Sequence, residues 1–195
     1  MAQAALRMRA AAAGLALVMA ALPAAAGPAV DAAARAEALL ADGRPAEAIE
    51  AARDALAAIW QAAPLAVLRA EPVLGRVRGW RDYRPRGSTT YRPDEIIRLY
   101  VEPVGFGYLT TPGGHRRIRL GVDLRILAPT RAVLAELPRI ARLEAEAGDE
   151  TREFYGELAY DLGPLPPGSY ILETTLRDLA SGERASFETA ITIAR

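Results

Sequence analysis

The chain has 195 residues, enough for one domain and a short appendage. All 24 basic residues are arginine and 24 acidic residues balance them, which argues against a general nucleic-acid binder. With one histidine and no cysteine, the chain cannot form disulfides, and the usual metal-binding clusters are disfavoured.

Residues 1–26 have the composition of a secretory signal. A basic start with Arg7 and Arg9 precedes a short apolar run, and small residues at Ala24 and Ala26 end the segment. The apolar run is shorter than the about 20 residues that a membrane-spanning helix needs. We therefore expect cleavage after Ala26, a periplasmic or secreted protein, and no transmembrane segment in the mature chain. Loss of two arginines leaves 22 against 24 acids, a net charge of −2.

Residues 31–63 carry a helical pattern in two parts. Apolar residues recur at helical spacing on both sides of Gly43 and Pro45, which fit the end of one helix and the first turn of the next. Pro64 ends the second helix, so we expect a helical hairpin at 27–64.

The hairpin stretch ALLADGRPAEAIEAARDAL resembles one tetratricopeptide unit. Proteins of that family stack about three or more units to bury their helix faces, and this chain has one. The resemblance implies a helical adaptor that acts through residues 31–63. The alternative is that the lone pair packs against its own domain.

From residue 65 onward the apolar period changes from helical to alternating, which indicates β-strands. In RIRLGVDLRI, Ile118, Leu120 and Val122 face one way, whereas Arg119 and Asp123 face the other. The same alternation predicts strands at 97–101, 152–162, 169–178 and 185–193, with weaker candidates at 72–79 and 131–137. Seven short strands with one apolar face each predict an antiparallel immunoglobulin-like β-sandwich at 65–195. The fold class is therefore mainly β with an N-terminal helical segment.

Several motifs resemble one group of proteins. PPGSYILETTLRDLASGERASF looks like the last hairpin of exported immunoglobulin-like modules. In order along the chain, APL, YRPRGSTTYRPDEIIRLYVEPVGFGY and TREFYGELAYDLGPLPPGSY are similar to a group of exported bacterial proteins of unknown function. The similarity covers roughly residues 55–195 and departs from the group at Asp94-Glu95, where Gly-Glu is commoner. It implies a fold and a compartment, and no activity.

Two carboxylates, Glu102 and Asp123, lie on the reverse faces of their predicted strands. If those strands are neighbours, the acids could share a face, as in glycan-processing enzymes whose carboxylates are about 5–10 Å apart. Arg98, Arg119 and Arg125 fall on the same face, and arginine neighbours favour a ladder of ion pairs instead.

The stretch YVEPVGFGY, residues 100–108, frames Glu102. Pro103 cannot donate a ladder hydrogen bond, so we expect it to end the strand or mark an edge. Glu102 is then expected as an ion-paired residue at the strand end. Gly105 and Gly107 suit a turn, because the further glycine of a dinucleotide-binding loop is absent.

Residues 76–93, the arginine–aromatic segment, interleave six arginines with Trp80, Tyr83 and Tyr91. Arginine and aromatic side chains together suit anionic surfaces through bidentate hydrogen bonds and stacking. The expected binding residues are Trp80, Tyr83, Arg84, Arg86, Tyr91, Arg92 and Glu102. The alternative is that the aromatic rings pack under the segment and its arginines pair with the acids of residues 144–153.

The sequence thus predicts an exported, non-enzymatic β-sandwich protein that binds an envelope protein or an anionic glycan. Nucleic acid is not expected as a partner, and neither a cofactor nor a metal is expected; His115 reads as an exposed loop residue. Two alternatives remain open: a glycan-processing enzyme using Glu102 with Asp123, and a helical adaptor acting through residues 31–63.

Overall fold

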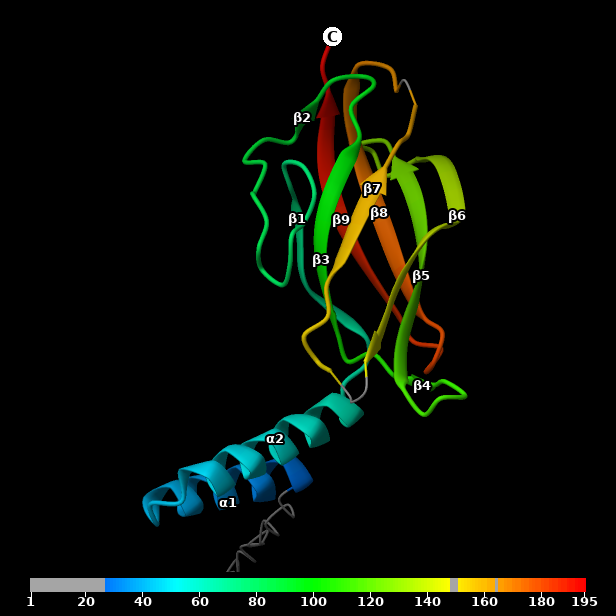
Figure 1. Cartoon of the computed structure of the whole chain (residues 1–195). Helices are drawn as coiled ribbons and strands as arrows, with labels where there is room; N and C mark the ends of the chain where they lie inside the picture. The colour runs from blue at the N-terminus through cyan, green and yellow to red at the C-terminus, as the bar shows by residue number, and fades with distance from the viewer. Residues whose placement is uncertain (1–26, 148–150, 164) are drawn as a thin grey trace, which may run out of the picture.

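The computed structural model describes residues 27–147, 151–163 and 165–195. Figure 1 shows a pair of helices, here called the arm, that extends from one end of a β-sheet body. The helices are α1 (Pro28–Ala41) and α2 (Pro45–Ala62). The strands are β1 (Ala66–Pro72), β2 (Thr90–Tyr91), β3 (Ile97–Val104), β4 (Leu109–Thr110), β5 (Arg116–Leu127), β6 (Val133–Ala147), β7 (Gly156–Tyr160), β8 (Gly168–Asp178) and β9 (Arg184–Ile193). The predicted secretory signal lies outside the described residues.

Local sequence explains the two helices of the arm. Pro28 and Pro45 occupy the first turns, where the missing amide hydrogen costs nothing. Gly43, with φ +72°, provides the left-handed turn between the helices. Pro64 follows the end of α2, so the predicted hairpin is confirmed. Within the described part of the chain, no helix is long and apolar enough to cross a membrane.

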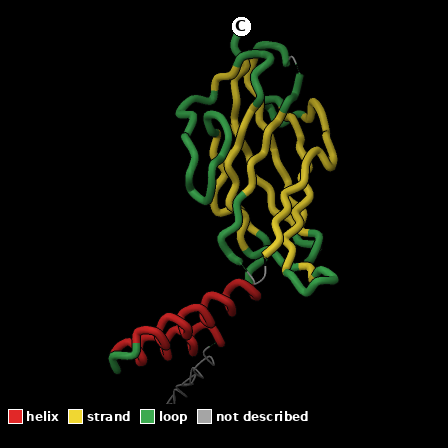
Figure 2. The backbone as a smooth tube through the Cα atoms, viewed as in Figure 1, coloured by secondary structure: helices red, strands yellow, loops and turns green. Residues whose placement is uncertain are grey.

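The β body consists of two sheets that share one core, and Figure 2 shows strands dominating this part of the chain. One sheet has the order β1-β3-β7. The other has the order β2-β9-β8-β5-β4, with β6 also paired to β5. All pairs are antiparallel except β2 with β9. The predicted mainly β class is confirmed.

Alternation decides which strand residues form the core. Leu99 and Leu158 from the first sheet meet Leu120 and Leu172 from the second, and none of these side chains is more than 1% exposed. Burial of such side chains contributes about 1.5–3 kcal/mol each to folding. The arm has its own small cluster, formed by Leu39, Ala48 and Ala51.

Several predicted strands differ from the structure: the strand predicted at 152–162 is the shorter β7, and the one predicted at 97–101 continues to Val104. The candidate at 72–79 is not a strand: β1 ends at Pro72, and the chain after it is irregular, with isolated bridges only at Val73 and Gly79. The candidate at 131–137 extends as β6 through Ala147, because β6 pairs with β5 along most of its length. Cross-strand ion pairs between β5 and β6 support this register: Arg119 with Glu144 at 2.9 Å and Arg117 with Glu146 at 2.7 Å. These two acids therefore pair with β5 and not with the arginine–aromatic segment.

Candidate functional site

The arginine–aromatic segment packs against the outer face of the three-stranded sheet. The rings of Tyr83 and Tyr100 stack with centroids 4.1 Å apart and planes at 24°. The Tyr83 hydroxyl donates a hydrogen bond to Glu71 Oε2 at 2.9 Å. Tyr100 stacks in turn on Tyr155 at 5.8 Å. Tyr83 is therefore half-buried, and both its ring and its hydroxyl make contacts within the protein.

Glu102 lies beneath this segment with no exposed surface. The Tyr100 hydroxyl donates to Oε1 at 2.8 Å, and Arg81 Nε and Nη2 donate at 3.3 Å each. Arg69 Nε lies 3.6 Å from the same carboxylate. The expected pairing with arginine is present, but the carboxylate is buried. Pro103 does not end the strand, because β3 continues to Val104 and Pro103 pairs with Val67 of β1. The pairing of β3 with β7 ends at Val101, so Pro103 lies where β3 has one neighbouring strand, as the edge alternative predicts.

The hydroxyl of Tyr100 belongs to this buried group. Its burial raises the pKa of Tyr100 to about 12, and its hydrogen bond to the Glu102 carboxylate acts in the same direction. The backbone N–H of Arg81 donates to the same hydroxyl oxygen at 3.0 Å. Arg81 holds a left-handed conformation, φ +55°, to make these contacts. The left-handed backbone at Arg81 and the buried charge of Glu102 indicate that the arginine–aromatic segment is held in one conformation against the sheet.

The assumption that Glu102 and Asp123 share a face is wrong. Glu102 is on β3 of one sheet and Asp123 on β5 of the other, and each points away from the common core. Asp123 accepts hydrogen bonds from Arg177 Nε at 2.6 Å and from the backbone N–H of Arg139 at 2.7 Å. Partial burial alone would raise the pKa of Asp123, but these donors hold it below its usual value. The two acids do not form a catalytic pair.

Other members of the expected site are also engaged internally. Arg86 pairs with Glu95, donates to the Thr90 carbonyl oxygen at 2.8 Å, and lies 4.1 Å from the ring centroid of Tyr91. Tyr91 is only 2% exposed.

Trp80 is half-buried, with the Arg81 guanidinium 5.3 Å from its ring centroid. Arg84 and Arg92 are exposed. An exposed patch joining Tyr83, Arg84 and Glu102, which binding through this segment requires, is therefore contradicted by the burial of Glu102.

Among the described residues, five of the eleven exposed large apolar side chains lie on the arm. These five are between 46% and 62% exposed: Val30, Leu40, Ile49, Leu56 and Ile59. Beside them is an open groove of about 270 Å³ along both helices, lined by Ala36, Glu37, Leu40, Pro45, Ala48, Ile49 and Ala52. On α2 the spacing 49, 52, 56, 59 is that of a helix–helix seam. The sequence shows this stripe, but not whether another element covers it.

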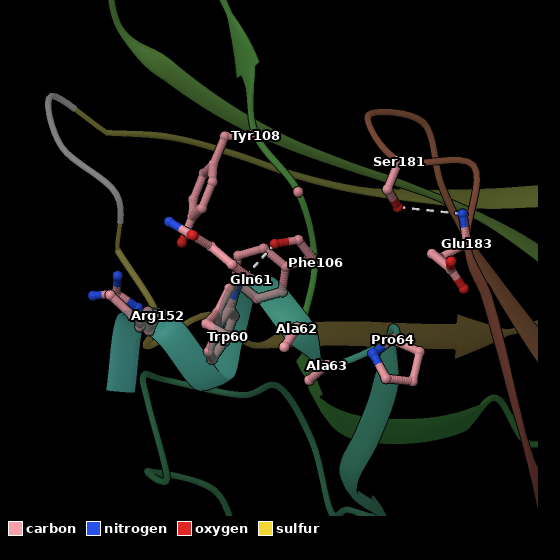
Figure 3. A pocket seen from close by; sticks show the side chains of 13 residues that line it. Trp60, Gln61, Ala62, Ala63, Pro64, Phe106, Tyr108, Arg152, Ser181 and Glu183 are labelled. Carbon is pink, nitrogen blue, oxygen red and sulfur yellow. Dashed lines mark hydrogen bonds between the residues drawn. The ribbon is translucent and has the colours of Figure 1, made fainter. Parts of the chain in front are cut away.

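The junction between arm and β body is formed by YVEPVGFGY. Trp60 Nε1 donates to the Phe106 carbonyl oxygen at 2.9 Å, and the two rings meet edge to face at 4.9 Å (Figure 3). A β-carbon at Gly105 would overlap the carbonyl oxygen of Pro64, so only glycine permits this approach. The turn predicted from Gly105 and Gly107 is therefore the part of the β body against which the end of α2 packs.

A cavity of about 390 Å³ opens beside this junction. Figure 3 shows Trp60, Phe106 and Tyr108 on one side and Ser181 with Glu183 on the other. The buried Asp178 fixes the adjoining turn: it accepts from Gly107 N at 2.6 Å and from Ser181 Oγ at 2.8 Å. In the part of the chain that the structure describes, no group of three His, Cys, Asp or Glu side chains could hold a metal ion.

Comparison with known proteins adds little. No family model matches the chain, and no curated protein matches it. Spo0M, a sporulation control protein from Bacillus subtilis, is similar at 13% identity and a TM-score of 0.34, over 68% of this chain and 50% of that one. The alkylpurine DNA glycosylase AlkC from Pseudomonas fluorescens is similar at 14% identity and a TM-score of 0.37, over 80% and 40%. This chain spans half or less of each neighbour, and likeness at this level supports no functional argument.

Proposed function

We propose that this chain is an exported, non-enzymatic binding module whose interaction surface is the apolar face of the arm. One observation carries the proposal: Leu40, Ile49 and Ile59 are more than half exposed on an element that extends away from the β body (Figure 1). Removing apolar surface from water stabilises an assembly by about 25 cal/mol per Å². Contiguous apolar patches on soluble proteins commonly mark interaction sites.

The β body serves as the rigid support of the arm in this proposal, and we assign it to the immunoglobulin-like β-sandwiches. The order β1-β3-β7 corresponds to strands A-B-E of that fold, and β9-β8-β5-β6 corresponds to G-F-C-C′. The Tyr170 hydroxyl donates to the Pro166 carbonyl oxygen at 2.8 Å, as in the tyrosine corner at the start of strand F. Both features support the assignment.

The partner is a protein in the cell envelope. An apolar face fits a protein surface better than it fits an anionic glycan, which needs exposed cations and hydrogen-bond donors. The signal-like composition of residues 1–26 supports the proposed export. A non-enzymatic role is supported by the ion-paired state of Glu102 and by the opposite placement of Asp123.

Because the chain has no cysteine, one introduced cysteine is a unique attachment point. A photo-crosslinker at Ala52→Cys, on the arm face, is compared with one at Ala190→Cys, an exposed site on β9. We expect protein adducts in intact cell envelopes from Ala52→Cys and not from Ala190→Cys. Equal labelling at both sites, or adducts formed instead at Arg84→Cys in the arginine–aromatic segment, would contradict the proposal.

A further inference from the structure

We propose that the partner of the arm is a second copy of this chain, so that two arms form a four-helix bundle with α1 of each copy opposite α2 of the other. This inference rests on the proposed function of the arm. It adds the identity of the occupant and the direction in which the two copies pair.

Each arm by itself is half of a stable helical unit. Its interior consists of Leu39, Ala48 and Ala51, which bury little apolar surface. Its outer face carries Leu40 and Ile49, which are larger than most of these buried residues yet 62% and 56% exposed. Four-helix bundles bury such faces by packing two layers of two helices together. A second identical layer supplies the missing apolar surface.

The charges on the two edges of the face are complementary under a twofold axis. Glu37 lines the groove on the α1 side, at the level of Ala48 and Ile49 of α2. Arg53 borders the α2 side, because it lies four residues after Ile49 and three before Leu56. One edge of the face thus carries an acid and the opposite edge a base.

The reach of Arg53 fits this pairing. It forms an ion pair with Glu50, so its guanidinium lies about one turn back along α2, at the level of Ile49. A twofold axis parallel to the helices places α1 of the second copy over α2 of the first. This rotation leaves each residue at the same position along the length of the arm. Glu37 of one copy then meets Arg53 of the other, twice in the dimer.

Other arrangements fit less well. A twofold axis perpendicular to the helices would place α1 of one copy on α1 of the other. Glu37 would then face the helix that carries the second Glu37, and Arg53 of the other copy would be out of its reach. The residues that line the groove, within 36–52, lie on either side of the turn between α1 and α2. Figure 1 shows that this turn is at the end of the arm away from the β body. That position leaves space for two β bodies at the same end of the bundle.

The first test is the mass of the chain in solution after export, measured by light scattering and by sedimentation over a range of concentrations. We expect a dimer that Leu40→Glu converts to a monomer. Leu68→Glu on β1 is the matched control, since Leu68 and Leu40 are both 62% exposed. A dimer that survives Leu40→Glu, or one that Leu68→Glu dissociates equally, would overturn the inference.

The second test is a charge-reversal cycle. Glu37→Arg and Arg53→Glu should each weaken dimerisation by about tenfold or more, and the double variant should recover most of the loss. No recovery in the double variant rules out the proposed pairing direction. Circular dichroism of each variant separates loss of association from loss of helix.

The outcomes distinguish this inference from the function on which it rests. If the chain is a monomer at every concentration but Ala52→Cys still forms adducts with another protein, the second-copy partner is wrong and the proposed function stands. If the chain is a monomer and Ala52→Cys forms no adducts, both are wrong. Adducts between two copies at Ala52→Cys support both.

Discussion

The indole nitrogen of Trp60, in the last turn of α2, donates to the backbone oxygen of Phe106 in the loop after β3, at 2.9 Å. The two residues are 46 positions apart, and their rings also meet edge to face at 83°. One side chain therefore links the arm to the β body by a directional bond and by packing. The direction of the arm therefore depends on the loop after β3 as well as on α2.

Trp60→Phe should loosen the arm without unfolding the β body. The ring contact with Phe106 is largely kept, but the carbonyl oxygen loses its donor, which costs about 1 kcal/mol. We expect faster amide exchange in the last turns of α2 and a wider spread of arm orientations in small-angle scattering. The β-body amides, such as those of β8, are the internal control. Equal acceleration throughout the chain would show that Trp60 supports global stability instead.

Gly105→Ala should destabilise the junction more than an alanine at another left-handed glycine. Gly105 has φ +71°, and a β-carbon there would overlap the Pro64 oxygen and lie 3.1 Å from its carbonyl carbon. Gly87 has φ +67° and no atom within 4 Å of the added carbon. Gly87→Ala therefore costs only the backbone term, about 1–2 kcal/mol. We expect Gly105→Ala to lower the free energy of unfolding by clearly more in urea titrations; equal losses would contradict the steric argument.

Glu102→Gln should release the arginine–aromatic segment. The substitution keeps the shape of the side chain but removes the charge that Arg81 and Arg69 pair with, and a broken buried pair costs about 3–5 kcal/mol at most. We expect a loss of stability together with faster proteolysis within residues 76–93. Glu146→Gln is the control, since its pair with Arg117 is exposed and should contribute less than about 1 kcal/mol. Similar effects from the two variants would show that burial of Glu102 is unimportant.

Tyr160 should make the fold sensitive to alkaline pH. Burial raises the pKa of Tyr160 from 10.0 to about 12, despite its hydrogen bond with Thr174. Between these values the unfolded chain loses the phenol proton while the folded chain keeps it. This contribution to stability is therefore complete below pH 10 and falls by about 3 kcal/mol as pH rises to about 12.

The measurement for Tyr160 is the free energy of unfolding in urea at several pH values above 9. Tyr160→Phe should flatten the decline, and adding Thr174→Val removes the hydroxyl that would otherwise be left unpaired. A decline of unchanged slope in the double variant would assign the effect to other groups.

Much of the fold is visible in the sequence because it follows from local periodicity. Alternating apolar residues predicted β3, β5, β8 and β9, and Gly43 with Pro45 predicted the break between the helices. β6 was only partly predicted, because residues 141–147 are small or charged apart from Leu143 and become a strand through pairing with β5. That pairing is a tertiary effect, which no short window of sequence reports.

The candidate site was predictable only in part, for a similar reason. The sequence indicated that Glu102 pairs with arginine, but its burial depends on a segment without regular structure folding over the sheet. Likewise, the stripe that includes Ile49 and Leu56 is readable as helical spacing, whereas its exposure depends on where α2 leaves the β body. The direction of α2 is set by contacts at Gly105 and Phe106, far away in the sequence.

The anchor at Trp60 and the apolar stripe beginning at Ile49 lie on one unbroken helix, with consequences for how the chain tolerates insertions. Each residue added between Ile59, the last residue of the stripe, and Trp60 turns the stripe by about 100° and moves it by about 1.5 Å. A single insertion therefore aims the stripe in a new direction, whereas seven residues, close to two full turns, return it nearly to its first direction about 10 Å farther out. The length of α2 thus determines both how far the apolar stripe lies from the β body and which way it faces.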